Sequence, residues 1–542
     1  MPLMSGGDAV VRSLIAHGIA SIYCLPGVQS DHLFNALFDA GEAINAVHTR
    51  HEQGAAYMAL GAALATGRPA AYSVVPGPGF LNSTAALATA QSTGAKVLAL
   101  IGQIPSRRIG KGRGYLHEIP DQLGILRTLT KWADRVERPA DAPGLVAQAF
   151  RELASGRVRP VGLELPPDML ARQEEVELVA PLPAEPPMPL DEDAIAQAAA
   201  ALDAAECPLI FVGGGALDAA PEVRALAERL AAPVVGYRRG KGVLDNRHVL
   251  SHALPGGHAL WAKADVVLAI GTRMFIPFTA WGSDDKLRII KVDIDAAEHD
   301  RWPVPVTPLT GDAAAILRRL DAHLAHRPPM DARRVAASRA LKARVADDFA
   351  ALGVMRDHLQ AIRDVLPDDG VLVDELTQVG YAARVAYEAR GPRTYISSGY
   401  QGTLGWGLAT ALGAKHALGA TPVVSITGDG GFMFNVQELA TAVRHRIPLV
   451  VVLFNDGAYG NVRNMQRHDH GNRVIATDLA NPDFMRLAAS FGIGGYRASD
   501  PGGLRVALER ALAQDEPTLI EVPCGTLPDP WRFIDMPKVR GV

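Results

Sequence analysis

Cysteine is scarce in this sequence, and the few cysteines are widely spaced. Cys24, Cys207 and Cys524 are the only three among 542 residues, and no CxxC pair occurs. A disulfide framework or a structural zinc site needs more cysteines at shorter spacing. We therefore expect a protein of a reducing compartment, and the cytoplasm fits this expectation.

The sequence also lacks an excess of charge of one sign and a long apolar run. Its 54 Lys and Arg residues face 58 Asp and Glu residues, which gives a net charge of −4, and no basic block stands out. Nucleic acid is therefore not an expected partner. No apolar run reaches the length of a membrane span, and the first residues lack the basic and apolar regions of a secretory signal. We expect no membrane partner.

What the chain does contain is an alternation of helical and short apolar β patterns, which predicts parallel α/β domains. Its length allows three of them. Five prolines at 179–189 predict a linker, and an Arg-Pro-Pro sequence at 327–329 predicts a second boundary. We expect domains at 1–178, 190–325 and 355–542, each a doubly wound parallel sheet.

The expected elements follow from the same patterns. Helices are predicted at 9–17, 31–40, 85–93 and 331–352, and strands at 21–25, 71–75, 97–101, 208–212, 233–236, 266–270, 289–293 and 518–522. The tail from Pro528 onward is irregular. It either reaches over an active site or forms a disordered end.

The clearest chemistry lies around two β-rich runs, 423–426 and 449–454, with one helix's worth of sequence between them. The expected order is strand, glycine turn, helix, strand. Asp429 lies in the turn 428–431, and Asp456 follows the second strand. Parallel sheets bind ligands at the ends of their strands, and Mg²⁺ prefers one or two carboxylates with phosphate oxygens and water. The pattern suits a magnesium ion that holds a diphosphate, with an ordinary strand-to-helix turn as the alternative.

These residues belong to a longer pattern: Gly-Asp-Gly at 428–430, then 24 residues, then Asn-Asp-Gly-Ala-Tyr-Gly. The pattern resembles the signature of thiamin-diphosphate enzymes. The resemblance implies that Asp429, the side chain of Asp456 and the main-chain carbonyl of Ala458 hold Mg²⁺, which in turn holds the diphosphate of the cofactor. The second asparagine of the family signature is Asp456 here, so Asn455 is kept as a reserve ligand.

A second motif, Arg-His-Glu-Gln-Gly-Ala at 50–55, opens an alanine-rich helix. It resembles the catalytic-glutamate motif of the same family. The resemblance implies that Glu52 hydrogen-bonds N1′ of the pyrimidine and promotes the tautomer whose 4′-nitrogen takes the proton from C2 of the thiazolium ring. A carboxyl group buried in an apolar site can hold the proton that this role needs. The alternative is a glutamate that only favours a helix N-terminus.

The resemblance also implies the other cofactor contacts. Leu404, within Gly-Thr-Leu-Gly-Trp-Gly at 402–407, matches the apolar wedge that bends the cofactor, although a leucine between glycines is otherwise a loop anchor. Gly402 would offer its carbonyl to the pyrimidine amino group. The remaining implied cofactor residues are Gly77, Asn82, Thr377, Gln378, Gly428, Gly430, Gly431, Ala458, Tyr459 and Gly460.

The resemblance covers essentially the whole chain, in the order pyrimidine-binding, middle and pyrophosphate-binding domain. It implies that the first and third domains are similar in architecture. It also implies that Glu52 of one subunit shares a site with Asp429 of another. We therefore expect a homodimer at least, and a homotetramer of two such dimers.

Within the family the chain most resembles acetolactate synthases, with departures at diagnostic positions. His117 stands in place of their active-site glutamine; it can shuttle protons, unless it is a surface histidine in a mobile loop. Val28 and Gln29 would crowd the space over the thiazolium ring. An arginine and a tryptophan that are implicated in choosing the second 2-keto acid correspond to Pro277 and Met465. We expect an enzyme other than the biosynthetic acetolactate synthase.

A strand that enters a triple glycine at 211–215 also begins the flavin-binding domain of acetolactate synthases, but three glycines alone are weak evidence. We expect no FAD in preference to bound FAD. The expected function is thiamin-diphosphate- and Mg²⁺-dependent decarboxylation or carboligation of a 2-keto acid or related carbonyl compound. Alternatives are a flavin-containing acetolactate synthase or pyruvate oxidase, a 1,2-diketone hydrolase, and a catalytically silent regulatory homologue. The presence of Glu52, Asp429 and Asp456 argues against silence.

Overall fold

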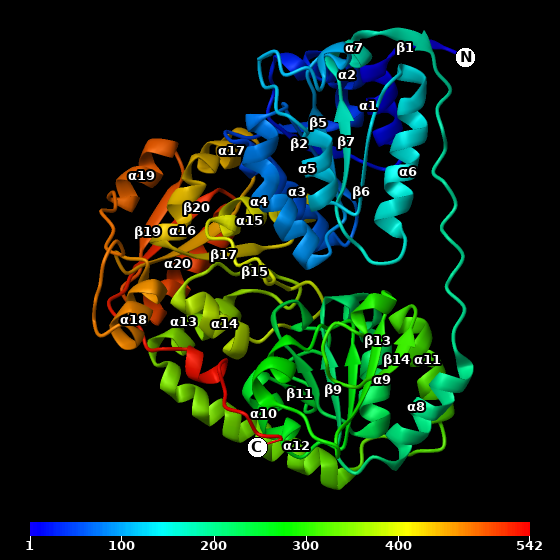
Figure 1. The fold of residues 1–542 in the computed structure, drawn as a ribbon. Coiled ribbons are helices and arrows are strands. Elements are labelled where there is room, and N and C mark those ends of the chain that lie inside the picture. Colours follow the sequence, from blue (N-terminus) through cyan, green and yellow to red (C-terminus); the bar gives the residue numbers. More distant parts are fainter. Residues whose placement is uncertain (542) are drawn as a thin grey trace.

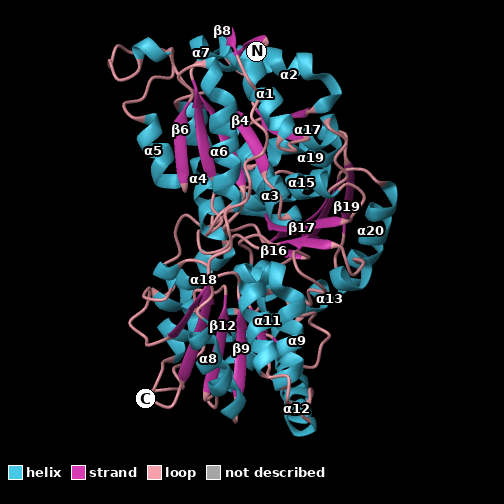
Figure 2. Cartoon of the chain, turned by 90° about the vertical axis from the view of Figure 1, so that its right-hand side faces the viewer, coloured by secondary structure: helices cyan, strands magenta, loops and turns pink. Residues whose placement is uncertain are grey.

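The computed structural model describes residues 1–541. Three six-stranded sheets, each with helices packed against it, form three lobes (Figure 1). Within each of these sheets every strand pairs in parallel with its neighbours, and a two-stranded antiparallel pair of β1 and β8 lies beside the first sheet. The predicted α/β fold with three parallel-sheet units is confirmed (Figure 2).

The first sheet has the strand order β3-β2-β4-β5-β7-β6. Its strands are β2 (Ser21–Cys24), β3 (Asn45–His48), β4 (Ala70–Val74), β5 (Val97–Gly102), β6 (Trp132–Arg135) and β7 (Val161–Leu165), and the flanking pair is β1 (Leu3–Ser5) and β8 (Gln173–Glu175). The helices of this lobe are α1 (Gly6–Ala16), α2 (Asp31–Ala40), α3 (Glu52–Thr66), α4 (Pro78–Thr93), α5 (Gln122–Leu129), α6 (Ala142–Ala154) and α7 (Pro167–Ala171).

The middle sheet has the order β11-β10-β9-β12-β13-β14, which is the 3-2-1-4-5-6 order common to dinucleotide-binding folds. Its strands are β9 (Pro208–Val212), β10 (Val234–Gly236), β11 (Ser251–His252), β12 (Val266–Ile270), β13 (Arg288–Asp293) and β14 (Thr307–Thr310). Its helices are α8 (Glu192–Ala204), α9 (Ala220–Leu230), α10 (Leu254–Trp261) and α11 (Ala313–His323). The proline-rich segment 179–189 has no regular structure and runs extended between the lobes, as predicted for a linker (Figure 1).

The third sheet has the order β16-β15-β17-β18-β20-β19. Its strands are β15 (Val371–Val373), β16 (Tyr395–Ile396), β17 (Val423–Gly428), β18 (Val450–Asn455), β19 (Gly494–Arg497) and β20 (Thr518–Pro523). Its helices are α13 (Val354–Val365), α14 (Gln378–Ala386), α15 (Trp406–Leu418), α16 (Asp429–Phe434), α17 (Leu439–Arg444), α18 (Gly460–Asp469), α19 (Phe484–Phe491) and α20 (Pro501–Gln514). Helix α12 (Ala332–Asp348), which precedes them in the chain, packs on α10 of the middle lobe.

The first and third lobes have the same architecture. Numbered within its own lobe, each sheet runs second, first, third, fourth, sixth, fifth strand. The lobes join through α3 and α15, whose backbones cross so closely that a Cβ at Gly61 would collide with the carbonyl of Thr410, and one at Gly413 with that of Met58. The small residues of both helices therefore serve a packing contact between lobes, and α3 is buried along nearly its whole length.

Three details differ from the sequence prediction. The segment between β17 and β18 is not one helix: α16 ends at Phe434, and a short 3₁₀ turn at Val436–Glu438 separates it from α17. The predicted glycine turn is the first turn of α16, which starts directly at the end of β17. The helix predicted at 331–352 ends at Asp348 and continues as a 3₁₀ turn.

Within residues 1–541, no helix has the length and apolar character that a membrane crossing requires.

Candidate active site

Two carboxylates lie at the edge of the third sheet where β17 and β18 end. In the pairing of the two strands, Gly428 of β17 lies opposite Phe454 of β18. Asp429 comes one residue after Gly428, and Asp456 comes two residues after Phe454. Asp429 is the first residue of α16, and its side chain is buried. This edge, beyond the carboxyl ends of parallel strands, is where open α/β sheets bind their ligands.

The two carboxylates perturb each other. Burial, and next the neighbouring Asp429, raise the pKa of Asp456 to about 6, and the two side chains are close enough to share a hydrogen bond. Like charges this close repel unless a proton or a cation lies between them. The backbone N–H of Ala458 donates to Asp456 Oδ1 at 3.3 Å, which holds the loop around the pair. The donor set fits Mg²⁺, which commonly binds one or two carboxylates plus phosphate oxygens and water.

Asn481 connects the two strand ends and was missed by the sequence analysis. Its Nδ2 donates to Asp429 Oδ2 at 2.6 Å and to Asn455 Oδ1 at 3.1 Å. Asn455 Nδ2 donates to Glu521 Oε1 at 2.9 Å. Both ends of the Asn455 amide are thus engaged within the protein, which favours Asp456 as the side-chain ligand. Asn481 lies in a loop outside every motif, so no sequence signal pointed to it.

The glycines at this edge lie where a side chain would collide with a neighbour. A Cβ at Gly430 would be 2.6 Å from ring atom Cε1 of Tyr459, and one at Gly428 would be 3.2 Å from Cβ of Thr377. A Cβ at Gly460 would collide with the carboxylate of Asp456. Backbone N–H groups with no Cβ in the way can approach a phosphate closely. The structure therefore brings together three predicted segments, 377–378, 428–431 and 456–460.

Gln378 occupies the same region, at the start of α14. Its side chain is buried, its Nε2 donates to Asn461 Oδ1 at 3.5 Å, and its Oε1 has no hydrogen-bond partner among residues 1–541. A buried polar atom without a partner marks a place where a ligand's polar group can bind. The tail reaches this point too: Trp531 Nε1 donates to Asn461 Oδ1 at 2.7 Å, and its ring lies 4.8 Å from that of Tyr381. The tail thus packs beside the candidate site.

The loop 402–407 lies against α16. Leu404 Cδ1 would be 3.3 Å from a Cβ at Gly431, so this leucine packs on the glycine segment. Gly405 has a φ of +85°, a left-handed conformation that other residues rarely adopt, and its carbonyl accepts a hydrogen bond from Asn435 Nδ2 at 2.6 Å. Gly402 also has a positive φ, +58°. The loop has one backbone path, held by its neighbours.

A buried carboxyl group, Glu375, lies beneath this loop. Its Oε2 accepts from the N–H of Gly407 at 2.8 Å and its Oε1 from that of Leu376 at 3.0 Å. Burial raises the pKa of Glu375 to about 7, against the weaker opposing effect of these backbone N–H groups. None of the ion pairs in residues 1–541 includes this carboxyl group.

The raised pKa of Glu375 predicts a pH dependence of stability. The folded protein binds this proton more tightly than the unfolded chain, whose pKa is near 4.5, so the stabilisation is complete below that pH and lost as the pH rises to about 7. The difference corresponds to about 3 kcal/mol. We expect the thermal midpoint of the cofactor-free protein to fall over this pH range by more than that of Glu375→Gln. Parallel curves for the two proteins would contradict the assignment.

A second group of predicted residues lies at the edge of the first sheet. Glu52 is the first residue of α3, and its Oε2 accepts a hydrogen bond from Asn82 Nδ2 at 3.1 Å. A Cβ at Gly79 would be 3.4 Å from Glu52 Oε1. The carboxyl group is 14% exposed and has no Lys or Arg partner within residues 1–541. Its Oε1 has no hydrogen-bond partner among the bonds found in residues 1–541.

His117 and Gln29 lie in the same group. The backbone of His117, with a φ of +68°, packs so closely on Gly77 that a Cβ there would collide with its carbonyl. Gln29 Nε2 donates to the carbonyl of Leu116 at 3.2 Å. His117 Nδ1 and Gln29 Oε1 are buried and lack hydrogen-bond partners in the described chain. Val28, in contrast, is 65% exposed on the single chain.

Within one chain the two groups remain separate. None of the hydrogen bonds found in residues 1–541 joins Glu52 to Asp429 or Asp456. The lobes contact each other beside Glu52, where the Glu438 carboxylate accepts from the N–H of Arg50 at 3.1 Å, and further along α4, where Thr89 Oγ1 lies 3.2 Å from Thr403 Oγ1. Asn82, the partner of Glu52, is seven residues from Thr89, roughly 10 Å along the helix.

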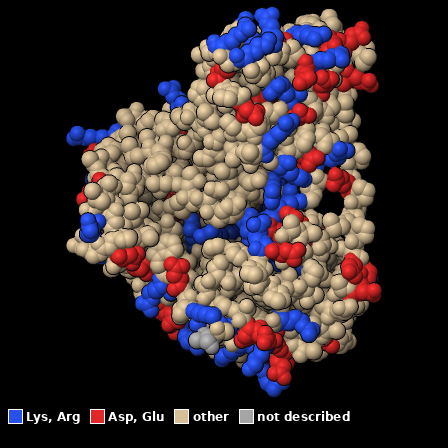
Figure 3. Space-filling model, viewed as in Figure 1, with Lys and Arg blue, Asp and Glu red and all other residues tan. Residues whose placement is uncertain are grey.

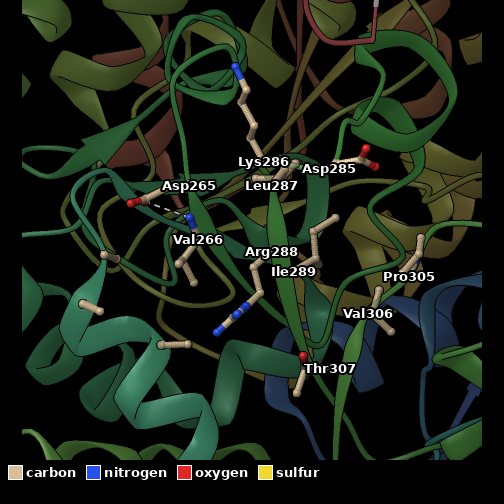
Figure 4. Close-up of a pocket in the computed structure, with 13 residues that line it drawn as sticks. Asp265, Val266, Asp285, Lys286, Leu287, Arg288, Ile289, Pro305, Val306 and Thr307 are labelled. Atoms are coloured by element: carbon tan, nitrogen blue, oxygen red, sulfur yellow. Dashed lines mark hydrogen bonds between the residues drawn. The ribbon is translucent and has the colours of Figure 1, made fainter.

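A cavity of about 530 Å³ lies away from both groups, in the middle lobe (Figure 4). It is lined by the first residues of β12 and β13, at the edge of the sheet opposite the usual ligand edge. Asp265 in its wall accepts backbone N–H groups from Glu206 at 2.6 Å and Cys207 at 2.9 Å, which is a structural role. We place no active site there.

Three family models match the chain. They are described as the N-terminal TPP binding domain, central domain and C-terminal TPP binding domain of thiamine pyrophosphate enzymes, and they match residues 4–125, 195–320 and 377–522.

Similar curated proteins cover nearly the whole chain. A probable 2-ketoarginine decarboxylase of Pseudomonas aeruginosa is 34% identical over 96% of this chain and 94% of its own. A probable acetolactate synthase large subunit of Methanocaldococcus jannaschii is 31% identical over 97% and 93%. The acetolactate synthase large subunit of Parasynechococcus marenigrum is 32% identical over 96% and 87%.

Proposed function

The chain belongs to the family of thiamine pyrophosphate enzymes, and from this premise we propose that it is a thiamin-diphosphate- and Mg²⁺-dependent decarboxylase or carboligase of a 2-keto acid. The observation that carries the proposal is the pair Asp429 and Asp456 at adjacent strand ends, in the lobe that matches the C-terminal TPP binding domain. The names of the relatives, a 2-ketoarginine decarboxylase and acetolactate synthases, support a 2-keto acid as the substrate class.

In this proposal Asp429, Asp456 and the carbonyl of Ala458 hold Mg²⁺, and the metal holds the diphosphate. The diphosphate would further contact the backbone of 428–431 and the side chains of Thr377 and Gln378, whose Nε2 is a donor of the kind that phosphate oxygens accept from. The remaining proposed cofactor residues are Gly77, Asn82, Gly402, Leu404, Tyr459 and Gly460. Thiamin diphosphate, when bound, would supply a nucleophilic carbon for the keto group and an electron sink for the loss of CO₂.

The protein's own part is orientation and proton movement. Glu52 is the carboxyl group proposed to hydrogen-bond the pyrimidine N1′, and Asn82 orients it. Leu404, fixed by its packing on Gly431, separates the two rings. His117, with a free Nδ1, moves a proton to or from the substrate.

We infer that two chains share each active site. The lack of a hydrogen bond between Glu52 and Asp429 within residues 1–541 supports this inference. The face over α4, α16 and α17 supports it further, since few charged side chains appear there (Figure 3). Exposed apolar residues lie on these helices and in two nearby turns of the first lobe: Leu81, Met433, Phe434 and Val443 on the helices, and Val28 and Leu116 in the turns. A second copy of the chain, in a homodimer or a homotetramer of two dimers, would cover them.

We propose that the chain works without flavin. The glycine turn after β9 is used for packing within the chain: Gly215 N–H donates to the carbonyl of Gly271 at 3.1 Å, and a Cβ at Gly215 would be 2.8 Å from Gly271 Cα. The guanidinium of Arg239 lies over the same turn, 3.2 Å from a Cβ at Gly214. These groups occupy the switch point of the sheet, where a dinucleotide would otherwise bind. The purified protein should be colourless.

We assign the domains to 1–178, 190–325 and 355–542. The end of β8 at Glu175 and the start of α13 at Val354 support the two outer limits.

The experiment that tests the function is a screen of 2-keto acids and 1,2-diketones with Mg²⁺ and thiamin diphosphate, with CO₂ and products followed together. The proposal expects cofactor-dependent CO₂ release from at least one 2-keto acid. Cleavage of a 1,2-diketone without any CO₂ release would replace it with the diketone hydrolase alternative.

The residues expected around the second substrate, the acceptor, predict little acetolactate from pyruvate alone and more product when an aldehyde is supplied. Met465 offers an adaptable apolar surface, and Pro277 removes a guanidinium that would hold an acceptor carboxylate. Arg273 is engaged elsewhere, since its guanidinium lies 4.5 Å over the Tyr400 ring. Product analysis with pyruvate, with and without an aldehyde, is the measurement. Efficient self-condensation with 2-ketobutyrate strongly preferred as acceptor would show the argument wrong, and Arg273 would become the first candidate partner of the carboxylate.

A further inference from the structure

Glu375 is a buried carboxyl group to which the mechanism above gives no role. Its side chain is 0% exposed, and both of its oxygens accept hydrogen bonds from backbone N–H groups instead of a Lys or Arg side chain. A buried carboxyl without a cationic partner is costly to keep, so its retention needs a reason. Its position two residues after the end of β15 and two before Thr377 places it beside the segments that the cofactor is proposed to contact.

Three of these segments meet at this one side chain. Oε2 accepts at 2.8 Å from the N–H of Gly407, the second residue of α15, where the segment 402–407 enters that helix. Cγ and Cδ lie 3.2 Å from where a Cβ at Gly431 would be, so the side chain also packs on the first turn of α16. Oε1 accepts from Leu376 at 3.0 Å, which fixes the backbone that leads into Thr377.

The loop depends on few other side chains. Asn435 Nδ2 donates to the Gly405 carbonyl at 2.6 Å, and a Cβ at Gly405 would collide with Phe434. Glu375 thus holds the N–H of Gly407, and Asn435 holds the carbonyl of Gly405. Leu404 directly precedes the first of these two held residues, Gly405, and its contact with Gly431 depends on the path of the loop.

We propose that Glu375 is a positioning residue for cofactor binding: its carboxyl group holds the loop 402–407, and with it Leu404 and Gly402, against the glycine segment 428–431. The inference rests on the proposed function, because it assigns the loop to the cofactor. Glutamine at 375 would keep the shape of the side chain but present an NH₂ group to one of the two N–H donors. That donor would then lose its acceptor, and the loop would loosen locally.

The test uses the full-length cofactor-free protein, so its first readout does not depend on activity. Hydrogen exchange of peptides that contain Gly407 should be slow in the wild type and faster in Glu375→Gln, while peptides from β17 and β18 keep their protection. Titration with thiamin diphosphate and Mg²⁺, followed by the fluorescence of the buried Trp406 and its fellow tryptophans, should show affinity about 10- to 100-fold weaker in the variant.

The matched control is Asp374→Asn. Asp374 is the neighbouring residue and is equally buried, but its carboxylate binds Arg384 Nε at 3.1 Å and the Tyr395 hydroxyl at 2.7 Å, away from the loop. This variant should lower the thermal midpoint at least as much as Glu375→Gln, yet leave loop exchange close to that of the wild type. Glu375→Asp, which retains the charge and withdraws it from Gly407, should fall between wild type and glutamine variant in cofactor affinity.

Several outcomes would overturn the inference. Fast exchange of the Gly407 amide in the wild type would show that the contact does not hold the loop, even if no variant folds. Equal loss of cofactor affinity in both variants, in proportion to their loss of stability, would reduce Glu375 to a structural residue. Equal affinity of the wild type and Glu375→Gln for thiamin diphosphate would reject this inference and leave the proposed function standing. Failure of the wild type to bind thiamin diphosphate would reject the proposed function itself.

Discussion

Glu52→Gln is expected to fold and bind thiamin diphosphate, and to lose about 10²–10⁴-fold in turnover, the usual contribution of a positioned acid or base. Glutamine keeps the size of the side chain and an oxygen that Asn82 can still reach, so the start of α3 should stay in place. What it cannot do is hold or release the proton that the pyrimidine N1′ needs. Turnover is measured with the best substrate of the screen, and exchange of the C2 proton of bound cofactor should slow in parallel. Exchange at the wild-type rate would remove Glu52 from its role.

Mixed subunits test whether Glu52 works across two chains. Glu52→Gln and Asp429→Ala should each be nearly inactive alone, since each lacks one half of every site. Refolding the two together should restore roughly a quarter of wild-type activity, because half of the dimers are then mixed and each of these has one intact site. If each site were built within one chain, every chain in the mixture would carry a defect and no activity would return.

Asp456→Ala is expected to raise the Mg²⁺ concentration needed to retain thiamin diphosphate by at least about 10- to 100-fold, the loss typical even of residues that only support a metal site. Asn455→Ala should raise it less, because the Asn455 amide is hydrogen-bonded to Asn481 and Glu521. Cofactor retention is measured by gel filtration at a series of Mg²⁺ concentrations. The reverse ranking of the two variants would move the ligand to Asn455.

The same site predicts how Mg²⁺ binding depends on pH. Burial and the nearby Asp429 raise the pKa of Asp456 to about 6, so below that pH the metal must displace a proton. Apparent Mg²⁺ affinity of the wild type should therefore fall as the pH drops through 6. In Asp456→Ala this part of the pH dependence should be absent.

Much of the fold was legible in the sequence because its strands and turns are strongly patterned. The buried runs that became β9, β12 and β18 are continuous apolar stretches bounded by glycine or proline, as parallel strands covered on both faces should be. The break between α16 and α17 was not legible. Asn435 interrupts that segment to bond the carbonyl of Gly405, a contact between residues far apart in the chain.

The candidate site was predictable only where it is built from contiguous motifs. Asp429 and Asp456 end adjacent strands, so their spacing along the chain already implied that they meet. Asn481 and Glu375 became visible only in three dimensions, because each acts through a hydrogen bond to a segment at least 26 residues away. The separation of Glu52 from Asp429 within one chain likewise depends on how the lobes pack at α3 and α15.

The central claim is that these residues bind thiamin diphosphate and activate it, whatever the substrate. The most direct measurement is the exchange of the C2 proton of the cofactor for deuterium in the wild-type protein loaded with Mg²⁺, followed by acid quench and NMR. The account predicts exchange at least ~10²-fold faster than in free thiamin diphosphate at the same pH, since a positioned acid–base group contributes at least that much. Exchange no faster than in the free cofactor would contradict it.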